Sequence, residues 1–330
     1  MGHRKHSQPR RGSIAYLPRG RAKSMEARVR TWSQQEFVEA RLVGHAGFKA
    51  GCIQIVSIDD REKTPNFGKQ LVSLGTVVVT PPITVVGIRG YTKKRQGLQV
   101  VFDVFAKDLP KELTRSFKTK PREDGLEKAK KSLGKTSEVY ALVALFPRDA
   151  KLEQKKPFIF EVRVMGGDIT KQFDYAKNLL GKEVKINEVF QNGESVDVAA
   201  ITKGKGWEGP VTRWGVKRKQ HKSRKSVREV ASLGPISPSN VMFTVPRAGQ
   251  RGFHQRTEYN KRIMIMDNTN ESKIKINPDG GFKHFGMVRG DFIVLRGSVP
   301  GTYRRLIKLR SPMRKLKSKI IQPKILEVVV

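Results

Sequence analysis

Residues 203–262 read KGKGWEGPVTRWGVKRKQHKSRKSVREVASLGPISPSNVMFTVPRAGQRGFHQRTEYNKR, a stretch that combines Gly-rich turns, dense positive charge and scattered aromatic residues without an apolar period. Unstructured connections longer than about 12–15 residues are uncommon in compact domains unless they are functional or disordered. Between Lys203 and Arg228 there are ten Lys or Arg residues and one acid, Glu208. A segment of this composition is typically ordered by packing on a polyanion. We therefore expect a long basic internal loop over residues 203–262.

The whole chain shows the same imbalance of charge. Its 330 residues include 66 Lys and Arg against 30 Asp and Glu, which gives a formal net charge of +36. Self-repulsion of this size implies an anionic partner, and nucleic acid is the leading candidate. Hydrophobic residues make up 37% of the chain, enough for a core of one large domain or two. We expect a globular centre with basic extensions.

A second basic extension is predicted at residues 1–31, which carry nine Lys or Arg and one acid, Glu26. No apolar segment follows its basic start, so we expect no secretory signal. The longest apolar stretch, from Leu71 to Ile88, is interrupted by Ser, Gly, Thr and Pro residues, which argues against a membrane span. We expect a soluble, cytoplasmic protein.

Cysteine and histidine usage argues against a disulfide or metal site. Cys52 is the one cysteine, and we expect its side chain in the core because it opens the strand-like run CIQIVSI. None of the six histidines has a metal-binding spacing, and no nucleophile elbow or phosphate-binding loop occurs. The adjacent acids Asp59–Asp60 and Glu123–Asp124 are interpreted as loop or helix-start residues. The sequence therefore predicts no enzyme.

Strand patterns dominate outside the basic segments. Many short strands separated by Gly turns predict a β-barrel or sandwich. Period-2 alternation of apolar residues occurs at Phe158, Phe160, Val162 and Val164, at Val196, Val198 and Ala200, and at Ile274 and Ile276. The apolar tail Ile325–Val330 is expected to return to the core.

Helices are predicted only in the middle of the chain. Apolar residues of one helical face recur over residues 169–180, with Asp168 as the N-cap and Gly181 after the C-terminus. Residues 107–134 are predicted to hold one or two charged surface helices. We therefore expect an α+β insertion at residues 92–182, and a barrel core built from residues 32–91, 183–202 and 263–330.

The basic loop contains motifs suited to RNA. In KGKGWEG, residues 203–209, glycine allows close backbone approach to a phosphate, lysine neutralises it and an indole can stack. The alternative is a Gly-rich turn whose Trp207 packs in the core. The charge run that follows could instead be a solvated helical face, but acids at i±4 are nearly absent. Around Ser237, Pro235 and Pro238 favour a rigid, non-helical tip.

Four motifs carry a resemblance to a known family. They are HRKHSQPRRGSIAYLPRGRA at residues 3–22, TKGKGWEGPVTRWGVKRKQHK at 202–222, TVPRAGQRGFHQRTEYNKR at 244–262 and GSVPG at 297–301. In order and over essentially the whole chain, they resemble the large-subunit ribosomal protein L-three family in its archaeal and eukaryotic form.

The resemblance implies a mainly β fold: a six-stranded Greek-key barrel of the translation-protein type with an α+β insertion, an extended N-terminal arm and a long RNA-penetrating loop. It implies binding to large-subunit rRNA near its 3′ end, early subunit assembly and support of the peptidyl transferase centre and aminoacyl-tRNA entry region. Neighbouring ribosomal proteins would be partners, within the cytoplasmic ribosome. No membrane, homo-oligomer or cofactor is implied, and structural Mg²⁺ and K⁺ would belong to the rRNA.

The predicted rRNA-binding residues lie in the two basic extensions. Those of the arm are Arg4, Lys5, Arg10, Arg11, Arg19 and Arg21. Those of the loop are Lys203, Lys205, Trp207, Arg213, Trp214, Lys217, Arg218, Lys219, Lys222, Arg224, Lys225, Arg228, Ile236, Ser237, Arg247, Gln250, Arg251, Phe253, His254, Arg256, Lys261 and Arg262. The aromatic residues, with Phe243 and Tyr259, are expected to fill gaps between RNA segments.

The loop tip, near Gly234–Asn240, departs from the family pattern. The family commonly has a Trp in a GxWxP pattern where this chain has Ile236 in GPISP, and a His or Asn where it has Ser237. Isoleucine keeps apolar bulk but lacks a planar face and an N–H donor.

Two other classes of function are consistent with a basic chain. One is an RNA-modifying or RNA-processing enzyme with basic arms for substrate capture, which would need a cofactor pocket or clustered titratable residues. The other is a DNA-coating protein, which would bind duplex DNA as well as structured rRNA. In the ribosomal interpretation, residues 1–31 and 203–262 of the isolated protein are expected to be mobile, and strong amide protection there would argue against it.

Overall fold

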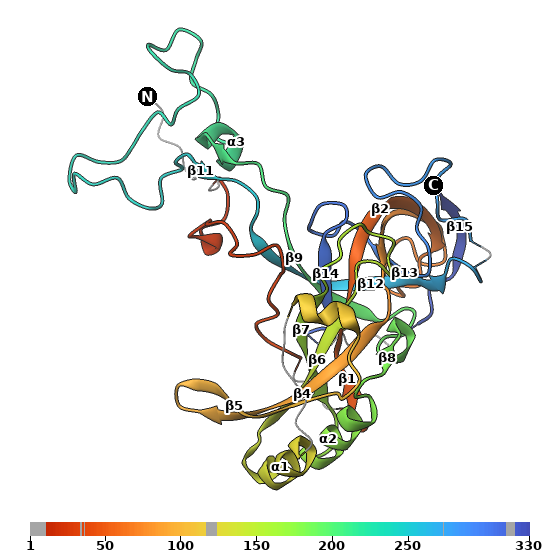
Figure 1. The fold of residues 1–330 in the computed structure, drawn as a ribbon. Coiled ribbons are helices and arrows are strands. Elements are labelled where there is room, and N and C mark those ends of the chain that lie inside the picture. Colours follow the sequence, from red (N-terminus) through yellow and green to blue (C-terminus); the bar gives the residue numbers. More distant parts are fainter. Residues whose placement is uncertain (1–10, 34, 36, 117–123, 273, 315–320) are drawn as a thin grey trace. The chain divides into compact units, whose positions relative to one another are not determined.

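The computed structural model describes residues 11–33, 35, 37–116, 124–272, 274–314 and 321–330. The fold is mainly β with a few helices (Figure 1). The chain divides into two compact units. The first, called the basic unit below, comprises residues 1–25 and 201–255, and the second, called the two-sheet unit, comprises residues 26–200 and 256–330.

The larger sheet closes on itself. Its strand order is β14-β9-β12-β13-β3-β2-β15, and β14 also pairs with β2, so six strands form a ring with β15 at an outer edge. The strands are β2 (Gly44–Ile58), β3 (Gln70–Val79), β9 (Ser195–Ile201), β12 (Gln255–Asn268), β13 (Asp291–Arg296), β14 (Leu306–Arg310) and β15 (Ile325–Val329).

The side chain of Cys52 is exposed, so its predicted place in the core is wrong. Along this part of β2, Gly51, Ile53 and Ile55 are buried and the alternate residues Cys52 and Gln54 are exposed. Side chains of a strand alternate between its two faces, and here the pair of isoleucines takes the inner face. An apolar run by itself does not say which of its two sets faces inward.

The smaller sheet has the strand order β1-β7-β6-β4-β5, with β8 also paired to β4. Its strands are β1 (Arg41–Leu42), β4 (Ile83–Lys94), β5 (Gly97–Phe105), β6 (Glu138–Leu145), β7 (Phe158–Met165) and β8 (Glu183–Val184). On β7, Phe160, Val162 and Val164 are buried, which confirms the alternation seen in the sequence. The first residues of β4 lie in the segment assigned to the barrel, residues 32–91, yet they pair with β6.

Short helices accompany the smaller sheet. They are η2 (Lys111–Arg115), α1 (Gly125–Ser132), η3 (Leu133–Lys135), α2 (Ile169–Asn178) and η4 (Ile186–Glu188). The amphipathic helix predicted at residues 169–180 is confirmed as α2, which buries Phe173 and Ala176. Asp168 occupies the N-cap position without a side-chain cap bond, and Gly181 has φ +80°, as expected after a helix C-terminus.

Of two predicted strand segments, one is absent from the structure and the other is present. Residues 274–277 form no strand, although Ile276 is buried. They lie in the connection between β12 and β13. Apolar residues at alternate positions of this connection give the same sequence pattern as a strand. The C-terminal tail pairs with β2 as the edge strand β15, and Leu326, Glu327 and Val329 remain exposed. The tail therefore joins the sheet at its edge, and its half-buried residues Ile325 and Val328 pack against the core as expected.

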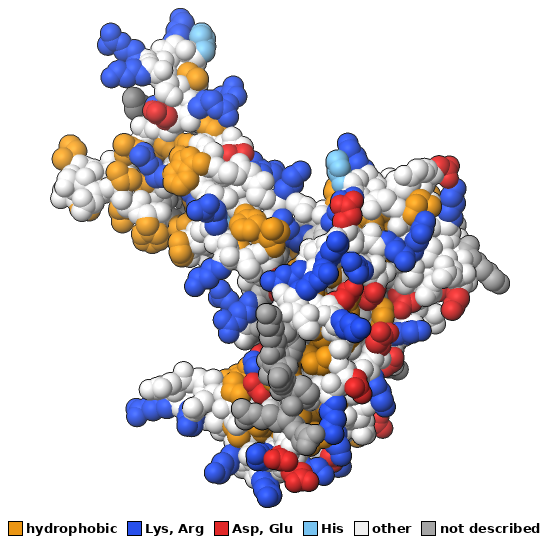
Figure 2. Space-filling model, viewed as in Figure 1, with side chains coloured by type: hydrophobic (Ala, Val, Ile, Leu, Met, Phe, Trp, Pro, Cys, Tyr) orange, Lys and Arg blue, Asp and Glu red, His pale blue; other side chains and the backbone are white. Residues whose placement is uncertain are grey.

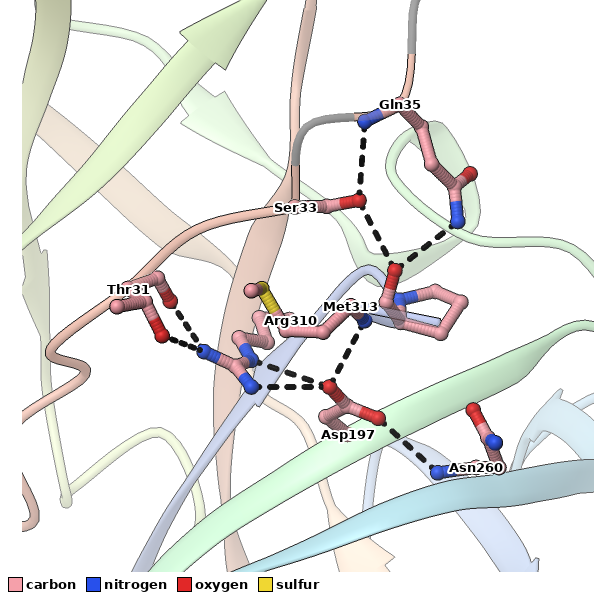
Figure 3. A network of polar contacts seen from close by, with 8 residues as sticks. Thr31, Ser33, Gln35, Asp197, Asn260, Arg310 and Met313 are labelled. Atoms are coloured by element: carbon pink, nitrogen blue, oxygen red, sulfur yellow. Dashed lines mark hydrogen bonds and ion pairs between the residues drawn. The ribbon is translucent and has the colours of Figure 1, made fainter. Parts of the chain in front are cut away.

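A buried ion pair joins three strands of the ring and ties the segments at Thr31 and Met313 to them (Figure 3). Nη2 of Arg310 on β14 donates to Oδ2 of Asp197 on β9 at 3.0 Å, and both side chains are almost fully buried. The other carboxylate oxygen accepts from the backbone N–H of Asn260, and Oδ2 also accepts from the N–H of Met313, each at 3.0 Å. Nη1 of Arg310 donates to the carbonyl oxygen of Thr31. Each charge is thus saturated by hydrogen bonds, as burial of an ion pair requires.

Removal of the Arg310 charge is expected to destabilise the two-sheet unit. Arg310→Met leaves Asp197 buried without its partner, so the free energy of unfolding should fall by about 3–5 kcal/mol. Lys128→Met is the control, because the Lys128–Asp124 pair is largely exposed and should contribute less than about 1 kcal/mol. Urea unfolding of both variants measures the difference, and equal losses would contradict the assignment.

A buried histidine makes stability depend on pH. His45 on β2 is fully buried, and its Nδ1 lies 2.9 Å from the carbonyl oxygen of Ala46. Burial lowers its pKa from 6.5 to about 4, against the opposing effect of hydrogen bonds to the backbone. The unfolded chain therefore binds a proton that the folded chain excludes, so stability is lost as pH falls from about 6.5 to about 4.

The expected loss is up to about 3 kcal/mol over this pH range. Carboxylates also titrate there, so the informative quantity is the difference in pH dependence between the parent protein and His45→Leu. The variant should lose less stability on acidification, as measured by urea unfolding at pH values between 7 and 4. Identical pH profiles would show that His45 is not the group responsible.

Candidate nucleic-acid interface

The basic loop is closed at its base by a two-stranded ladder. Strand β10 (Trp207–Glu208) pairs antiparallel with β11 (Gly249–Gln250). Backbone hydrogen bonds continue the pairing beyond the ladder, with Lys205 N–H donating to the carbonyl of Arg251 and Thr202 N–H to that of His254, each at 2.9 Å. The ladder brings the two ends of the loop together, so residues 209–248 form one excursion.

A short helix places Trp214 inside the basic unit. Helix α3 (Pro210–Trp214) follows Gly209, with proline at its first position, and ends at Gly215 in the left-handed conformation. The indole of Trp214 is 8% exposed, and its Nε1 donates to the carbonyl of Arg247 at 3.0 Å. Trp214 is thus a packing residue here, which differs from the expectation that it fills gaps in RNA.

The N-terminal segment packs on the same indole. The Arg19 guanidinium lies 3.8 Å from the centroid of the Trp214 ring. A Cβ added to Gly12 would lie 2.6 Å from Trp214 Cε3, so only glycine fits at that contact. Ala22 N–H donates to the carbonyl of Phe253 at 2.8 Å. The two basic segments therefore form one structural unit, a pairing that no local sequence pattern indicates.

The half-buried cations of the basic unit are occupied by contacts within it. Arg213 donates to the carbonyls of Gln250 and Arg247, each at 3.1 Å, and burial lowers its pKa. Arg251 donates to Glu208 at 2.7 Å. Lys219 Nζ lies 3.9 Å from the Glu229 carboxylate. With Arg19 on the indole, all four half-buried cations hold the fold together.

The remaining cations of the basic unit are exposed. Its described part contains sixteen Lys and Arg and two acids, Glu208 and Glu229. Figure 2 shows many Lys and Arg side chains and few acids on the visible face of this unit. In the part of the unit that the structure describes, none of the exposed cations forms an ion pair. They are Arg11, Arg21, Lys23, Lys203, Lys205, Lys217, Arg218, Lys222, Arg224, Lys225, Arg228 and Arg247.

The long excursion is irregular beyond α3. Residues 215–248 contain neither helix nor strand, so the alternative of a solvated helical face is wrong. All residues from 231 to 243 are exposed, including Ile236 at 96% and Phe243 at 72%. Ser237 lies in this tip and precedes Pro238 in a cis peptide. A segment with this much exposed apolar surface has the composition of a binding surface.

The two tryptophans of the loop differ in environment. Trp207 is 77% exposed, so the alternative in which it packs in a core is wrong. Its neighbours Lys203 and Lys205 are exposed too, and Gly206 has φ +69°. Trp207 thus presents a free indole face among cations, the combination that stacks on nucleobases.

Several predicted residues lie elsewhere or are engaged. His254 is buried and its Nδ1 lies 2.8 Å from the carbonyl of Gly20. Arg256, Lys261 and Arg262 belong to β12, where Lys261 pairs with Glu258 and Arg262 with Asp60. Gln250 donates to the carbonyl of Gly252. Arg4, Lys5 and Arg10 lie outside the described residues.

The arrangement suits binding of a polyanion. Exposed cations without acid partners neutralise phosphates, and exposed Trp207 and Phe243 offer stacking surfaces. Among the described residues, no group of three His, Cys, Asp or Glu side chains is placed to hold a metal ion. No helix in the described part of the chain is long and apolar enough to cross a membrane.

Comparisons with known proteins place these features in a family. The family model for Ribosomal protein L3 matches residues 1–330. Large ribosomal subunit protein uL3 of Methanothermobacter thermautotrophicus is 39% identical over 317 residues, which cover 94% of this chain and 93% of the relative. The same-named protein of Archaeoglobus fulgidus is 42% identical over 94% of this chain and 93% of its own length. That of Methanococcus vannielii is 40% identical over 97% and 96%.

The contact between Gly12 and Trp214 can be tested by a single methyl group. Gly12 has φ +73°, so Gly12→Ala combines backbone strain with a clash against the indole. The expected cost is about 1–3 kcal/mol, which should raise amide exchange at Ala22 and Gly215 roughly tenfold or more. Gly20→Ala is the matched control, because an added Cβ there meets nothing within 4 Å. Equal exchange in the two variants would refute the packing described.

Proposed function

This chain belongs to the Ribosomal protein L3 family, and we propose that it is a constituent of the large ribosomal subunit that binds large-subunit rRNA through the basic unit. It is not an enzyme. The observation that supports this role is the set of twelve exposed cations of the basic unit, none of which pairs with an acid in the described part of that unit.

Electrostatics supplies the binding free energy. Each phosphate that a Lys or Arg neutralises releases condensed counterions, so log K changes by roughly −0.7 to −0.9 per contact against log salt concentration. The described fold of the basic unit lowers the ordering cost of binding, because Trp214 already holds residues 11–22 against the loop. Lys203, Lys205 and the charge run from Lys217 supply the phosphate contacts.

The finer role follows the family. We propose that the closed ring is the six-stranded Greek-key barrel. The strand order supports this, because β9, β12 and β13 follow one another along the chain within this sheet and are adjacent in it, and the next strand of the sheet, β14, returns beside β9. Residues 1–31 and 203–262 would approach the peptidyl transferase centre and the aminoacyl-tRNA entry region, and binding near the 3′ end of the rRNA would promote early assembly. Neighbouring large-subunit proteins complete the environment in the cytoplasmic ribosome, and any Mg²⁺ or K⁺ belongs to the rRNA.

Two other functions have less support. An RNA-modifying enzyme needs a cofactor pocket or clustered titratable groups, and among the described exposed residues of the basic unit the acids and histidines are limited to Glu229 and His221. Turnover of rRNA by the purified protein would favour it. A DNA-coating protein would bind duplex DNA as tightly as rRNA, whereas shape-specific RNA binding should survive excess DNA.

The salt dependence of rRNA binding tests the proposal. The four-fold variant Lys217→Gln, Arg218→Gln, Lys222→Gln and Arg224→Gln should lower the magnitude of the slope of log K against log salt by roughly 3. The matched control removes the same charge from exposed lysines of the two-sheet unit, with Lys130→Gln, Lys131→Gln, Lys135→Gln and Lys155→Gln.

Filter binding with in vitro transcribed large-subunit rRNA of the same organism, between 50 and 300 mM KCl, measures both slopes. The control should keep most of the parent slope. Equal effects of the two variants would mean that net charge alone governs binding, and the assignment of the interface to the basic unit would fail.

A further inference from the structure

The two-sheet unit carries an aromatic and basic surface of its own. It consists of Lys283, His284, Tyr303 and Arg304, called the ring-pair patch below. The rings of His284 and Tyr303 are 6.1 Å apart between centroids, with an interplanar angle of 39°. All four residues are exposed, Tyr303 at 43%. None of them belongs to the two basic extensions.

The first half of the patch is held by a tight turn. Phe282 and Gly286 exchange backbone hydrogen bonds at 2.9 and 2.8 Å, and Phe285 N–H donates to the carbonyl of Phe282 at 3.0 Å. Phe282 and Phe285 are both buried, and a Cβ on Gly51 would collide with the Phe282 ring. His284 is therefore presented outward between two buried anchors.

The second half is held to the ring. Arg304 N–H donates to the carbonyl of Lys49 on β2 at 2.9 Å, which continues the pairing of β14 with β2. The ammonium group of Lys49 donates to the carbonyls of Val299 at 2.6 Å and Gly301 at 3.3 Å, which fixes the GSVPG loop before Tyr303. Hydrogen bonds thus hold the backbone on both sides of Tyr303.

The charge of the patch is not neutralised by the protein. Lys283 and Arg304 are exposed and form no ion pair with any described acid. The acid nearest in sequence, Asp279, pairs with Lys275 at 2.6 Å. The backbone is also strained here, because the non-glycine residues His284 and Arg304 both have positive φ, at 64° and 62°.

We propose that the ring-pair patch is a second RNA contact, in which an unpaired nucleobase stacks on His284 and Tyr303 while Lys283 and Arg304 bind the flanking phosphates. RNA fits better than an acidic protein segment, because exposed rings beside cations recognise splayed bases together with the backbone. The patch rests on the proposed function, since it needs rRNA as the ligand. It extends rRNA contact to the two-sheet unit.

The aromatic half of the patch is tested by removing the rings of His284 and Tyr303 while the net charge and the backbone conformation are kept. The double variant His284→Asn with Tyr303→Leu suits this purpose, because asparagine tolerates the left-handed conformation and leucine keeps apolar bulk. Binding to the in vitro transcribed large-subunit rRNA should weaken roughly fivefold or more, the lower end expected for a stacked base. Tyr303→Phe should bind as the parent does, and Phe67→Leu, at another exposed aromatic residue, should be neutral.

Ultraviolet crosslinking followed by mass spectrometry adds a direct readout, with a nucleotide adduct expected on Tyr303. For the charged half, Lys283→Gln should lower the magnitude of the salt slope by about 0.7 to 0.9, whereas Lys130→Gln should leave it unchanged. Thermal unfolding of each variant checks that the two-sheet unit is folded. If the double variant does not fold, the salt slope of Lys283→Gln still tests the patch.

The outcomes separate this proposal from the previous one. If the patch variants bind rRNA like the parent and Tyr303 gives no adduct, while the variant with four substitutions in the basic unit shows the expected smaller salt slope, the patch proposal fails and the ribosomal role stands. If neither set affects binding, both fail. Loss of binding to an acidic ribosomal protein with unchanged rRNA affinity would also overturn the assignment to RNA.

Discussion

One buried indole holds the basic unit together against its own charge. Among the described residues of this unit, sixteen cations repel one another, two acids offset them only in small part, and the buried hydrophobic side chains are limited to Ile201 and Trp214. Trp214 supplies the centre: Arg19 lies over its face, Gly12 allows the N-terminal segment to approach, and its N–H binds the carbonyl of Arg247. Attraction between a guanidinium and an indole face turns a repelling charge into a stabilising one. The fold of both basic segments depends on this contact.

The cations of the basic unit therefore divide into two groups with different tasks. The half-buried Arg213 and Arg251 use their several N–H donors to bind carbonyls and a carboxylate, for which the planar guanidinium is well suited. The exposed cations keep their charge for an external anion. Because these contacts lie within the chain, folding offsets the conformational entropy that residues 11–22 and the loop stem lose on ordering. The entropic cost of binding a partner is therefore smaller. The mobility of residues 1–31 and 203–262 in the isolated protein, expected from the sequence, stays a prediction.

The sequence predicted what local periodicity and charge determine, and missed what distant contacts determine. The apolar face of α2 and the alternation at Phe160, Val162 and Val164 are local, and both are confirmed. By contrast, Trp207 and Trp214 lie seven positions apart among similar glycines and cations, yet one is exposed and the other buried. Trp214 is covered by Gly12 and Arg19, which lie about two hundred residues away in the sequence. The pairing of β14 with both β9 and β2 and the outward side of Cys52 likewise depend on strands that no local pattern identifies.

The tip of the loop exposes an apolar side chain, Ile236, where the related family commonly has a tryptophan. Ile236 is 96% exposed in a segment where every neighbour is exposed, so none of the residues that the structure describes covers its apolar surface. Full burial of such a side chain against a partner is worth about 1.5–3 kcal/mol, but it is non-directional. An indole at this position would add a planar face and an N–H donor, which select orientation. With isoleucine beside Ser237, the tip offers apolar surface and one hydroxyl, so in the proposed rRNA complex directional recognition would fall to Trp207 and the cations nearer the stem.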